Sequence, residues 1–173
     1  MNEAQPDDQT VTDEGESVAR LPVGVEFRPT NSQVDDRGVL WELFDPRWNL
    51  PGGPAKGAYC TTVRPGKIKG WNVHRKHSDR YSVLFGELIA VFYDDRPDSP
   101  TNGLVGELVL SEYRRGTVFI PVDVWHAVHN VGNKDAVIAN FPTELYDYES
   151  PDKYRLPLDN NQIPYTFRTS RGW

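Results

Sequence analysis

Short apolar stretches alternate with turn-forming residues between positions 21 and 142 of this chain. The stretches are four to seven residues long and rich in Val, Ile, Phe and Tyr, which is typical of β-strands. The residues between them are mostly Gly, Pro, Asn and Asp, which favour turns. We expect strands at 39–44, 58–63, 80–85, 87–93, 107–110, 117–122 and 136–141.

The same region lacks the length and the 3.6-residue period of a long amphipathic helix. Many short strands joined by turns favour an all-β sandwich or closed barrel, such as a jelly roll. After residue 142 the chain is rich in Pro and Tyr, and we expect a C-terminal segment of turns or short helix that packs on the sheet. Residues 1–20 are polar and acidic, so we predict a disordered tail followed by one domain over residues 21–173.

Composition narrows the possible partners. The chain has 25 acidic and 19 basic residues and a net charge of -6, which argues against binding to nucleic acid or to a membrane surface. It has no apolar run of roughly 20 residues and no visible signal peptide. Cys60 is the single cysteine, so it cannot form an internal disulfide; we expect it to be buried and the protein to be cytoplasmic.

Two clusters contain all four histidines. His74 and His77 lie in GWNVHRKHSDR, and His126 and His129 lie in WHAVHN. Residues two apart on a strand face the same side, so Asn72 and His74 would point together into the barrel. His77 and His129 are out of phase with this face, and we expect them to support the site or to lie at the surface. A basic pocket for an anion is compatible with the acidic chain, because Lys67, Lys69, Arg75, Lys76 and Arg80 surround the first cluster.

The spacing of these clusters resembles the two sequence motifs of the cupin superfamily. The matching positions are Gly66, Asn72, His74, Asp79 and Gly86 in the first motif, and Gly116, Pro121, His126 and Asn130 in the second. This resemblance implies a double-stranded β-helix, the cupin form of the jelly roll. Asn72 stands where the motif has its first histidine, and Asp79 stands where it has glutamate.

Several longer strings resemble the dTDP-4-dehydrorhamnose 3,5-epimerase family, also called RmlC-like. They are DDRGVLWELF at 35–44, KGWN at 69–72, FGELIAVFYDDRPDSPTNG at 85–103, VFIPVDVWHAV at 118–128 and LPLDNNQIPY at 156–165. The resemblance implies a homodimer that binds a nucleotide-diphospho-4-keto-deoxysugar in its barrel. By match, Arg37 and Glu42 would hold the nucleotide of the neighbouring subunit, and Lys69 replaces an arginine that contacts phosphate. Sugar ketoisomerase cupins, which share the second cluster, are close relatives.

The residues that handle protons in this family have changed. Epimerisation next to a ketone needs a base to remove the acidic proton and an acid to return it. Asn72 occupies the position of the family's base, and an amide is not a useful proton acceptor. Asp159 matches the aspartate that pairs with this base. The family's lysine aligns with Asp79, next to Arg80, and its acidic tyrosine aligns near position 139 or 140, where there is no phenol.

Three interpretations follow. In the first, the protein is an isomerase without a cofactor, in which His74 is the base, His126, Tyr81 or Tyr146 assists, and Asn72, Arg80 and Tyr81 bind substrate. In the second, Fe, Mn or Ni is held by Asn72, His74, Asp79 and His126 and supports oxygenase or lyase chemistry. In the third, the pocket binds a sugar nucleotide or another natural-product intermediate, as a binding protein or a repurposed cyclase.

Overall fold

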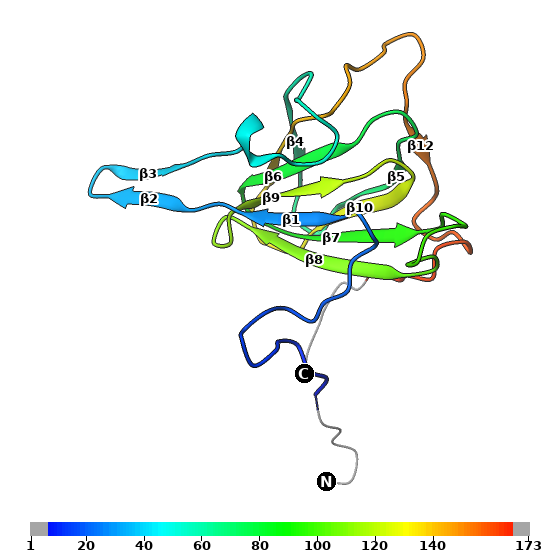
Figure 1. Ribbon diagram of the computed structural model, residues 1–173, viewed down its shortest axis with the longest axis horizontal. Helices are drawn as coiled ribbons and strands as arrows, with labels where there is room; N and C mark the ends of the chain where they lie inside the picture. The colour runs from blue at the N-terminus through cyan, green and yellow to red at the C-terminus, as the bar shows by residue number, and fades with distance from the viewer. Residues whose placement is uncertain (1–6, 168–173) are drawn as a thin grey trace.

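The computed structural model describes residues 7–167, which form two antiparallel five-stranded sheets and a separate hairpin (Figure 1). The strand order is β1–β9–β6–β11–β4 in one sheet and β12–β5–β10–β7–β8 in the other. The first sheet contains β1 (Glu26–Pro29), β4 (Tyr59–Val63), β6 (Asp79–Phe85), β9 (Gly116–Ile120) and β11 (Ala136–Asn140). The second contains β5 (Ile68–Val73), β7 (Glu87–Asp94), β8 (Val105–Ser111), β10 (Val124–Asn130) and β12 (Tyr154–Arg155).

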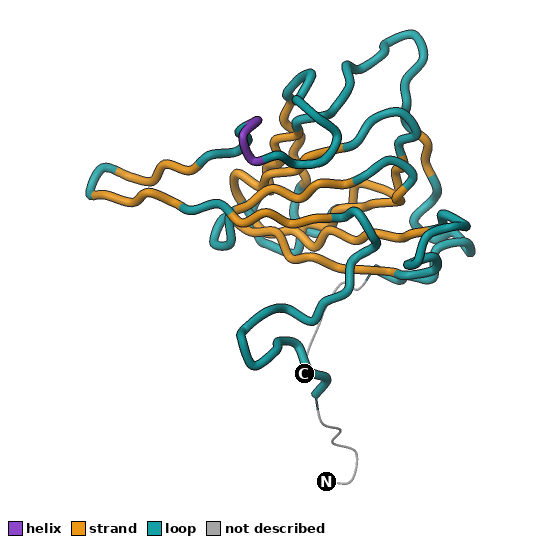
Figure 2. Tube along the Cα trace, in the orientation of Figure 1, coloured by secondary structure: helices purple, strands orange, loops and turns teal. Residues whose placement is uncertain are grey.

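The predicted all-β jelly roll is confirmed. Each expected stretch contains a strand, although the stretch 39–44 is extended only as far as Trp41, in β3 (Gly38–Trp41). Figure 2 shows that strands account for nearly all regular structure, and within residues 7–167 the helical part is one 3-10 turn, η1 (Pro46–Trp48). The C-terminal segment therefore consists of turns and the short strand β12, with no helix in its described part.

The core lies between the two sheets. Leu88 and Phe92 of β7 are fully buried against Val118 of β9 and Ile138 of β11. A second apolar layer covers the outer face of the β5–β10–β7 sheet, where Trp71 packs against Tyr165 and Phe167 of the C-terminal segment. Because apolar burial supplies most of the driving force for folding, these layers fix the two sheets relative to each other.

Gly86 makes the tight connection between β6 and β7. Its φ of +87° lies in the left-handed region, and an added Cβ would come within 2.7 Å of the Ala136 backbone. Only glycine combines this backbone conformation with this close approach. The turn reverses the chain, so β6 and β7 enter different sheets and bring their inward side chains to face each other.

The hairpin of β2 (Ser32–Asp35) and β3 projects away from the two sheets (Figure 1). Arg37 lies at its tip, where its side chain forms an ion pair with Asp35 and is 84% exposed. Val34 and Leu40 are also largely exposed on this hairpin. Within one chain the hairpin therefore leaves apolar surface uncovered.

Two expectations about local structure have different outcomes. Cys60 is exposed on β4, not buried, because β4 is the edge strand of its sheet. Residues 7–20 form a mostly exposed loop with one bridge between Val11 and Ser17. Disorder of the tail stays a prediction; residues 1–6 of the tail and 168–173 of the predicted domain lie outside the described residues.

The described chain contains no helix that is long and apolar enough to cross a membrane.

Candidate active site

A cavity of about 350 Å³ lies between the two sheets and is large enough for one small organic ligand. Its walls come from strands of both sheets and from the C-terminal segment around β12. The residues that line it are Tyr59, Thr61, Ile68, Lys69, Gly70, Asn72, Tyr81, His126, Val128, Ile138, Lys153 and Arg155. Asn72 and His126 are direct neighbours in the β5–β10 pairing, which explains why both face the same interior.

Asp79 is the carboxylate at the inner end of this site, and it is 1% exposed. Its Oδ2 lies 3.3 Å from His74 Nε2 and 3.5 Å from His126 Nε2, and its Oδ1 accepts a hydrogen bond of 2.7 Å from Asn140 Nδ2. Burial alone would raise the pKa of Asp79, but the hydrogen bond from His74 and the neighbouring imidazoles hold it well below its usual range. Asp79 is therefore ionised inside the barrel.

His126 is an unprotonated imidazole. Burial lowers its pKa to about 4, despite the opposing charge of Asp79. Its Nδ1 lies 3.1 Å from the carbonyl of Val124, an acceptor, so this nitrogen carries the hydrogen and donates it. The lone pair therefore resides on Nε2, which lies 3.5 Å from the Tyr81 hydroxyl. The result is an available proton acceptor in the wall of the cavity.

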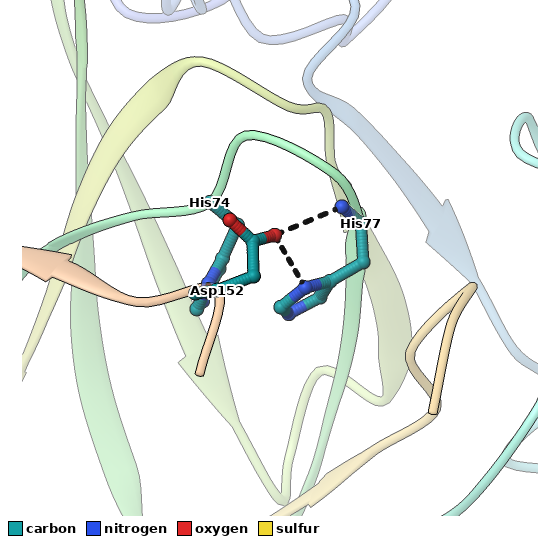
Figure 3. Close-up of side chains that lie close together, drawn as sticks. All are labelled: His74, His77 and Asp152. Carbon is teal, nitrogen blue, oxygen red and sulfur yellow. Dashed lines mark hydrogen bonds and ion pairs between the residues drawn. The ribbon is translucent and has the colours of Figure 1, made fainter. Parts of the chain in front are cut away.

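His74 differs from His126 in the direction of its pKa shift. Nδ1 contacts the backbone carbonyl of Asp152, and Nε2 faces Asp79. Burial lowers the pKa of His74, but the hydrogen bond and charge of Asp79 outweigh this effect and raise the pKa overall. The neighbouring His77 stacks on it at 4.0 Å between ring centroids, and its pKa is lowered by burial and by the charge of His74. Figure 3 shows His74, His77 and Asp152 as one cluster, beside the end of β5.

Two phenols complete the polar wall. Tyr81 lies on β6 with the same orientation as Asp79, and burial raises its pKa well above the usual value. Tyr59 lies on β4, and its hydroxyl accepts a 2.7 Å hydrogen bond from Asn140 Nδ2. Burial and the charge of Asp79 raise the pKa of Tyr59. Both phenols are therefore protonated at neutral pH.

A divalent metal ion fits part of this arrangement. The ligand atoms of His74, Asp79 and His126 all lie within 4.8 Å of one another, and the buried Asp79 Oδ2 faces both imidazoles. The donors around a tetrahedral ion at about 2.1 Å are about 3.4 Å apart, close to the two distances from Asp79 Oδ2. Asn72, the fourth predicted ligand, lines the same cavity beside His126.

The structure brings together most of the residues predicted from the first motif and His126. Lys69, Asn72, Tyr81 and His126 line the cavity, and His74 and Asp79 border it. Arg37 and Glu42 do not reach it within one chain: Arg37 is at the hairpin tip, and Glu42 borders a separate groove beside Trp48. The role of these two residues toward a neighbouring subunit stays a prediction.

Arg80 is a correction to the predicted substrate-binding set. It is fully buried on the opposite side of β6 from Tyr81, because neighbouring residues on a strand face opposite ways. Its guanidinium donates to the carbonyls of Pro51, Gly53 and Phe141. These bonds hold a loop against the outer face of the sheet, so Arg80 is not available to a ligand in the cavity.

Asp159 and Tyr146 are also outside the cavity. Asp159 is exposed in a turn of the C-terminal segment, and the described carboxylates that contact the histidines are Asp79 and Asp152. Tyr146 is 53% exposed and packs against Tyr148. The expected pairing of Asp159 with the base is therefore wrong for the chain as it folds here.

Sequence reasoning missed five residues of the site: Tyr59, Asn140, Asp152, Lys153 and Arg155. The predicted absence of a phenol near position 140 is true of β11 itself. However, Tyr59 from the adjacent strand β4 occupies this place, directly opposite Asn140 in the strand register. Period-two alternation in AYCTTV was the available signal, because it puts Tyr59 and Thr61 on one face.

Comparison with known proteins shows the family. A probable low-salt glycan biosynthesis epimerase, Agl13 from Haloferax volcanii, is 35% identical over 136 residues, covering 78% of this chain and 87% of the relative. This chain belongs to the RmlC-like family of carbohydrate epimerases. A second relative is the spore coat polysaccharide biosynthesis protein SpsL from Bacillus subtilis. It is 30% identical to this epimerase-family chain over 146 residues, which cover 84% of this chain and 96% of SpsL. No family model matches the chain.

Solved structures of other RmlC-like proteins share the fold. A dTDP sugar isomerase from Desulfovibrio desulfuricans G20 superposes with a TM-score of 0.76 at 22% identity, covering 84% of this chain and 91% of that one. ChmJ, a 3'-monoepimerase from Streptomyces bikiniensis in complex with dTDP-quinovose, has a TM-score of 0.71 at 16% identity, covering 87% of this chain and 82% of ChmJ. At these sequence identities the comparison shows only that the fold is shared.

Proposed function

We propose that the protein epimerises or isomerises a nucleotide-diphospho-4-keto-deoxysugar by moving a proton on a carbon next to the ketone. Membership of an epimerase family supports the reaction class, and the dTDP-quinovose bound to ChmJ supports the substrate class. The observation that carries the proposal is the unprotonated His126, which faces ionised Asp79 and neutral phenols in one cavity. This mechanism uses no cofactor.

His126, not His74, is the base in this proposal. Both imidazoles contact Asp79 Oδ2, but burial lowers the pKa of His126 to about 4, whereas the hydrogen bond and charge of Asp79 raise the pKa of His74. His126 Nε2 takes the proton from the substrate carbon, and the electrons of the broken C–H bond form the enolate. The imidazolium that results is stabilised by Asp79 Oδ2, 3.5 Å away.

The negative charge of the enolate resides on the former ketone oxygen, which needs hydrogen-bond donors. Asn72 and Tyr81 line the cavity and supply an amide N–H and a phenolic O–H. This role gives a physical reason for an amide at position 72, because an amide donates hydrogen bonds well although it is a poor base. His74 is then a positioning residue, since its hydrogen bond to Asp79 lowers the pKa of this carboxyl and keeps it ionised.

Tyr59 is the acid that returns the proton in this proposal. It lies on β4, in the sheet opposite the one that carries His126, so the two groups reach the substrate from different sides. Donation breaks the O–H bond of Tyr59 and forms the new C–H bond, and the phenolate that remains accepts the hydrogen bond of Asn140. Abstraction on one side and return on the other inverts the carbon.

A homodimer and a cytoplasmic location are part of the proposal. The projecting β2–β3 hairpin exposes Val34 and Leu40, and a second copy of the chain would cover such apolar surface. In that arrangement Arg37 and Glu42 would hold the nucleotide of the neighbouring subunit. The unpaired thiol of Cys60 fits a reducing compartment.

A metal-dependent reaction is the second candidate, favoured by the convergence of His74, Asp79 and His126. These residues would hold Fe, Mn or Ni, and the ion would supply Lewis-acid chemistry. Elemental analysis of protein purified without added metal separates the two candidates. One equivalent of a transition metal that is lost in His126→Gln would show that His126 is a ligand and not the base, because His74, His77 and Asp152 form a second cluster that could hold an ion.

Incubation with a dTDP-4-keto-6-deoxyhexose in deuterated water tests the proposed function. We expect deuterium to enter C3 or C5 of the sugar, because the Tyr59 hydroxyl exchanges with solvent and returns deuterium in place of the proton that His126 removes. Mass spectrometry and proton NMR measure this incorporation. Tight nucleotide binding without exchange would contradict the proposal and would favour a binding protein.

The pH profile of this exchange should have an unusually low acid limb. His126 is active only when neutral, and its pKa is about 4, so kcat/KM should fall only as the pH drops toward 4. Circular dichroism at each pH is the control for folding. It is needed because unfolded His126 titrates near its ordinary pKa of 6.5, so its contribution to stability decreases as the pH falls from about 6.5 toward 4. An acid limb near 6.5 with intact structure would point to another base.

A further inference from the structure

Three cations converge on the cavity without a carboxylate partner. Lys69, Lys153 and Arg155 all line it, and none forms an ion pair with a carboxylate of residues 7–167. Lys69 donates instead to the hydroxyl of Thr61, at 2.8 Å. Unpaired positive charge in one cavity of a chain with a net charge of -6 indicates an anionic ligand.

The mutual repulsion of these cations supports this interpretation. The pKa of Lys153 is lowered by burial and then by the charges of Arg155 and Lys69, and the opposing attraction of Asp79 does not reverse this shift. An anion bound between them would relieve this repulsion. Of the basic residues that surround the first histidine cluster in sequence, only Lys69 belongs to this group, and the other two cations come from the C-terminal segment.

Strand β12 and the residue before it carry the two side chains that line the cavity from the C-terminal segment, Arg155 and Lys153. The strand pairs with β5, opposite Val73 and Asn72, and this register alternates its side chains between the two faces. Lys153 and Arg155 face inward, whereas Tyr154 faces outward beside Arg75, whose guanidinium lies 5.8 Å from the ring centroid. A lysine provides a point charge and an arginine a planar fork, and both suit phosphate oxygens.

Asp152 fixes the start of this strand. Its carboxylate accepts hydrogen bonds from the backbone N–H groups of Arg75, Lys76 and His77, at 2.9, 2.8 and 3.2 Å. It also accepts one from His77 Nδ1 at 2.9 Å, and Figure 3 shows its two bonds to His77. Because Asp152 directly precedes Lys153, this anchorage holds the cation at the mouth of the cavity.

We propose that Lys153 and the strand β12 that follows it form a diphosphate-binding element, in which Lys153 and Arg155 join Lys69 around the diphosphate of the nucleotide sugar and Asp152 is their positioning residue. The inference rests on the proposed function for the identity of the ligand. It adds two binding residues and one positioning residue that the sequence motifs do not contain.

Calorimetric titration with dTDP and with thymidine, which lacks the diphosphate, tests the two cations. The wild-type protein should bind dTDP at least about 10-fold more tightly than thymidine. Lys153→Ala and Arg155→Ala should each weaken dTDP binding by about 10- to 100-fold, and thymidine binding should not change. Lys134→Ala is the matched control, because it removes an equal charge from an exposed turn that is not part of the cavity.

Asp152→Asn tests the positioning role. It should weaken dTDP binding by about 10-fold, and the effect should be much smaller in a protein that already carries Lys153→Ala. General damage to the fold would instead weaken the binding of both dTDP and thymidine, and its effect would add to that of Lys153→Ala. Asp147→Asn is the control, because this exposed carboxylate of the same segment accepts only from Glu149 and Ser150.

Wild-type affinity for dTDP in Lys153→Ala and Arg155→Ala would overturn the inference, as would equal wild-type affinities for dTDP and thymidine. Deuterium incorporation by the wild-type protein decides the proposed function separately. If the wild-type protein incorporates deuterium and the two variants bind dTDP as tightly as the wild type, only the proposed role of Lys153 and β12 is wrong.

Discussion

Replacement of His126 by glutamine is expected to reduce deuterium incorporation into the keto-sugar by about 10³-fold, within the range that general base catalysis contributes. Glutamine approximates the size of imidazole and has no useful basicity, so the cavity keeps its shape and loses its proton acceptor. The dissociation constant of dTDP should change by less than about threefold, because the proposed diphosphate contacts come from other strands. Exchange is measured by mass spectrometry, and binding by calorimetry.

His129→Gln is the matched control for this variant. His129 lies on the same strand, but it is on the outer face of the sheet, where its ring contacts Phe167. The His129→Gln variant should incorporate deuterium within a few-fold of the wild-type rate. If His126→Gln also retains exchange, His126 is not the base. Loss of exchange in His74→Gln alone would then return the role to His74.

Replacement of Asp79 by asparagine should lower the free energy of unfolding by about 3 kcal/mol, because removing one member of a buried ion pair leaves the other uncompensated. Asp79 is 1% exposed, and His74 would lose the charge that raises its pKa. The amide also brings an N–H group toward Asn140 Nδ2, which already donates to this position. Urea denaturation at pH 7 measures the change, and NMR titration of His74 should show a lower pKa.

Asp35→Asn provides the comparison for the stability measurement. It removes a carboxylate from the exposed hairpin pair with Arg37, and such surface pairs contribute little to stability. We expect no resolvable change in the denaturation midpoint. A denaturation curve of Asp79→Asn that coincides with that of the wild type at pH 7 would contradict an ionised, paired Asp79 in the folded protein. The contribution of Asp79 should disappear as the pH falls through its depressed pKa, because both states are then protonated.

Local sequence predicted the all-β class and most of the strands, but the expected apolar stretches did not include β5 and β10, which carry Asn72 and His126. Strand-length apolar stretches separated by Gly, Pro, Asn and Asp predicted each of the observed strands between 39 and 141 that they covered. The turn at Gly86 was predictable for the same reason, since its positive φ excludes most other residues. The same local rule also exposes the error at Arg80. Adjacent residues on a strand cannot face the same side, so Tyr81 in the cavity requires Arg80 on the other face.

The chemical roles were less accessible, because they depend on what surrounds each side chain. His74 and His126 look equivalent as imidazoles in the sequence. The folded chain gives His74 two acceptors and a raised pKa, and it gives His126 a buried position with a pKa of about 4. Asn72 looked like the loss of a catalytic group, and its position in the cavity wall instead suits a hydrogen-bond donor.

The sequence by itself determined that the chain is all-β, because alternation and turn chemistry are local properties, and its resemblance to the cupin motifs predicted that Asn72 and His126 face a common interior. Only the tertiary structure decided that Tyr59, Asp152, Lys153 and Arg155 complete the site. The Asp152 side chain, for example, binds the Arg75 backbone across a separation of 77 residues. Such contacts follow from the lateral order of the strands, and strand order depends on the burial of the whole core, not on any short stretch of residues.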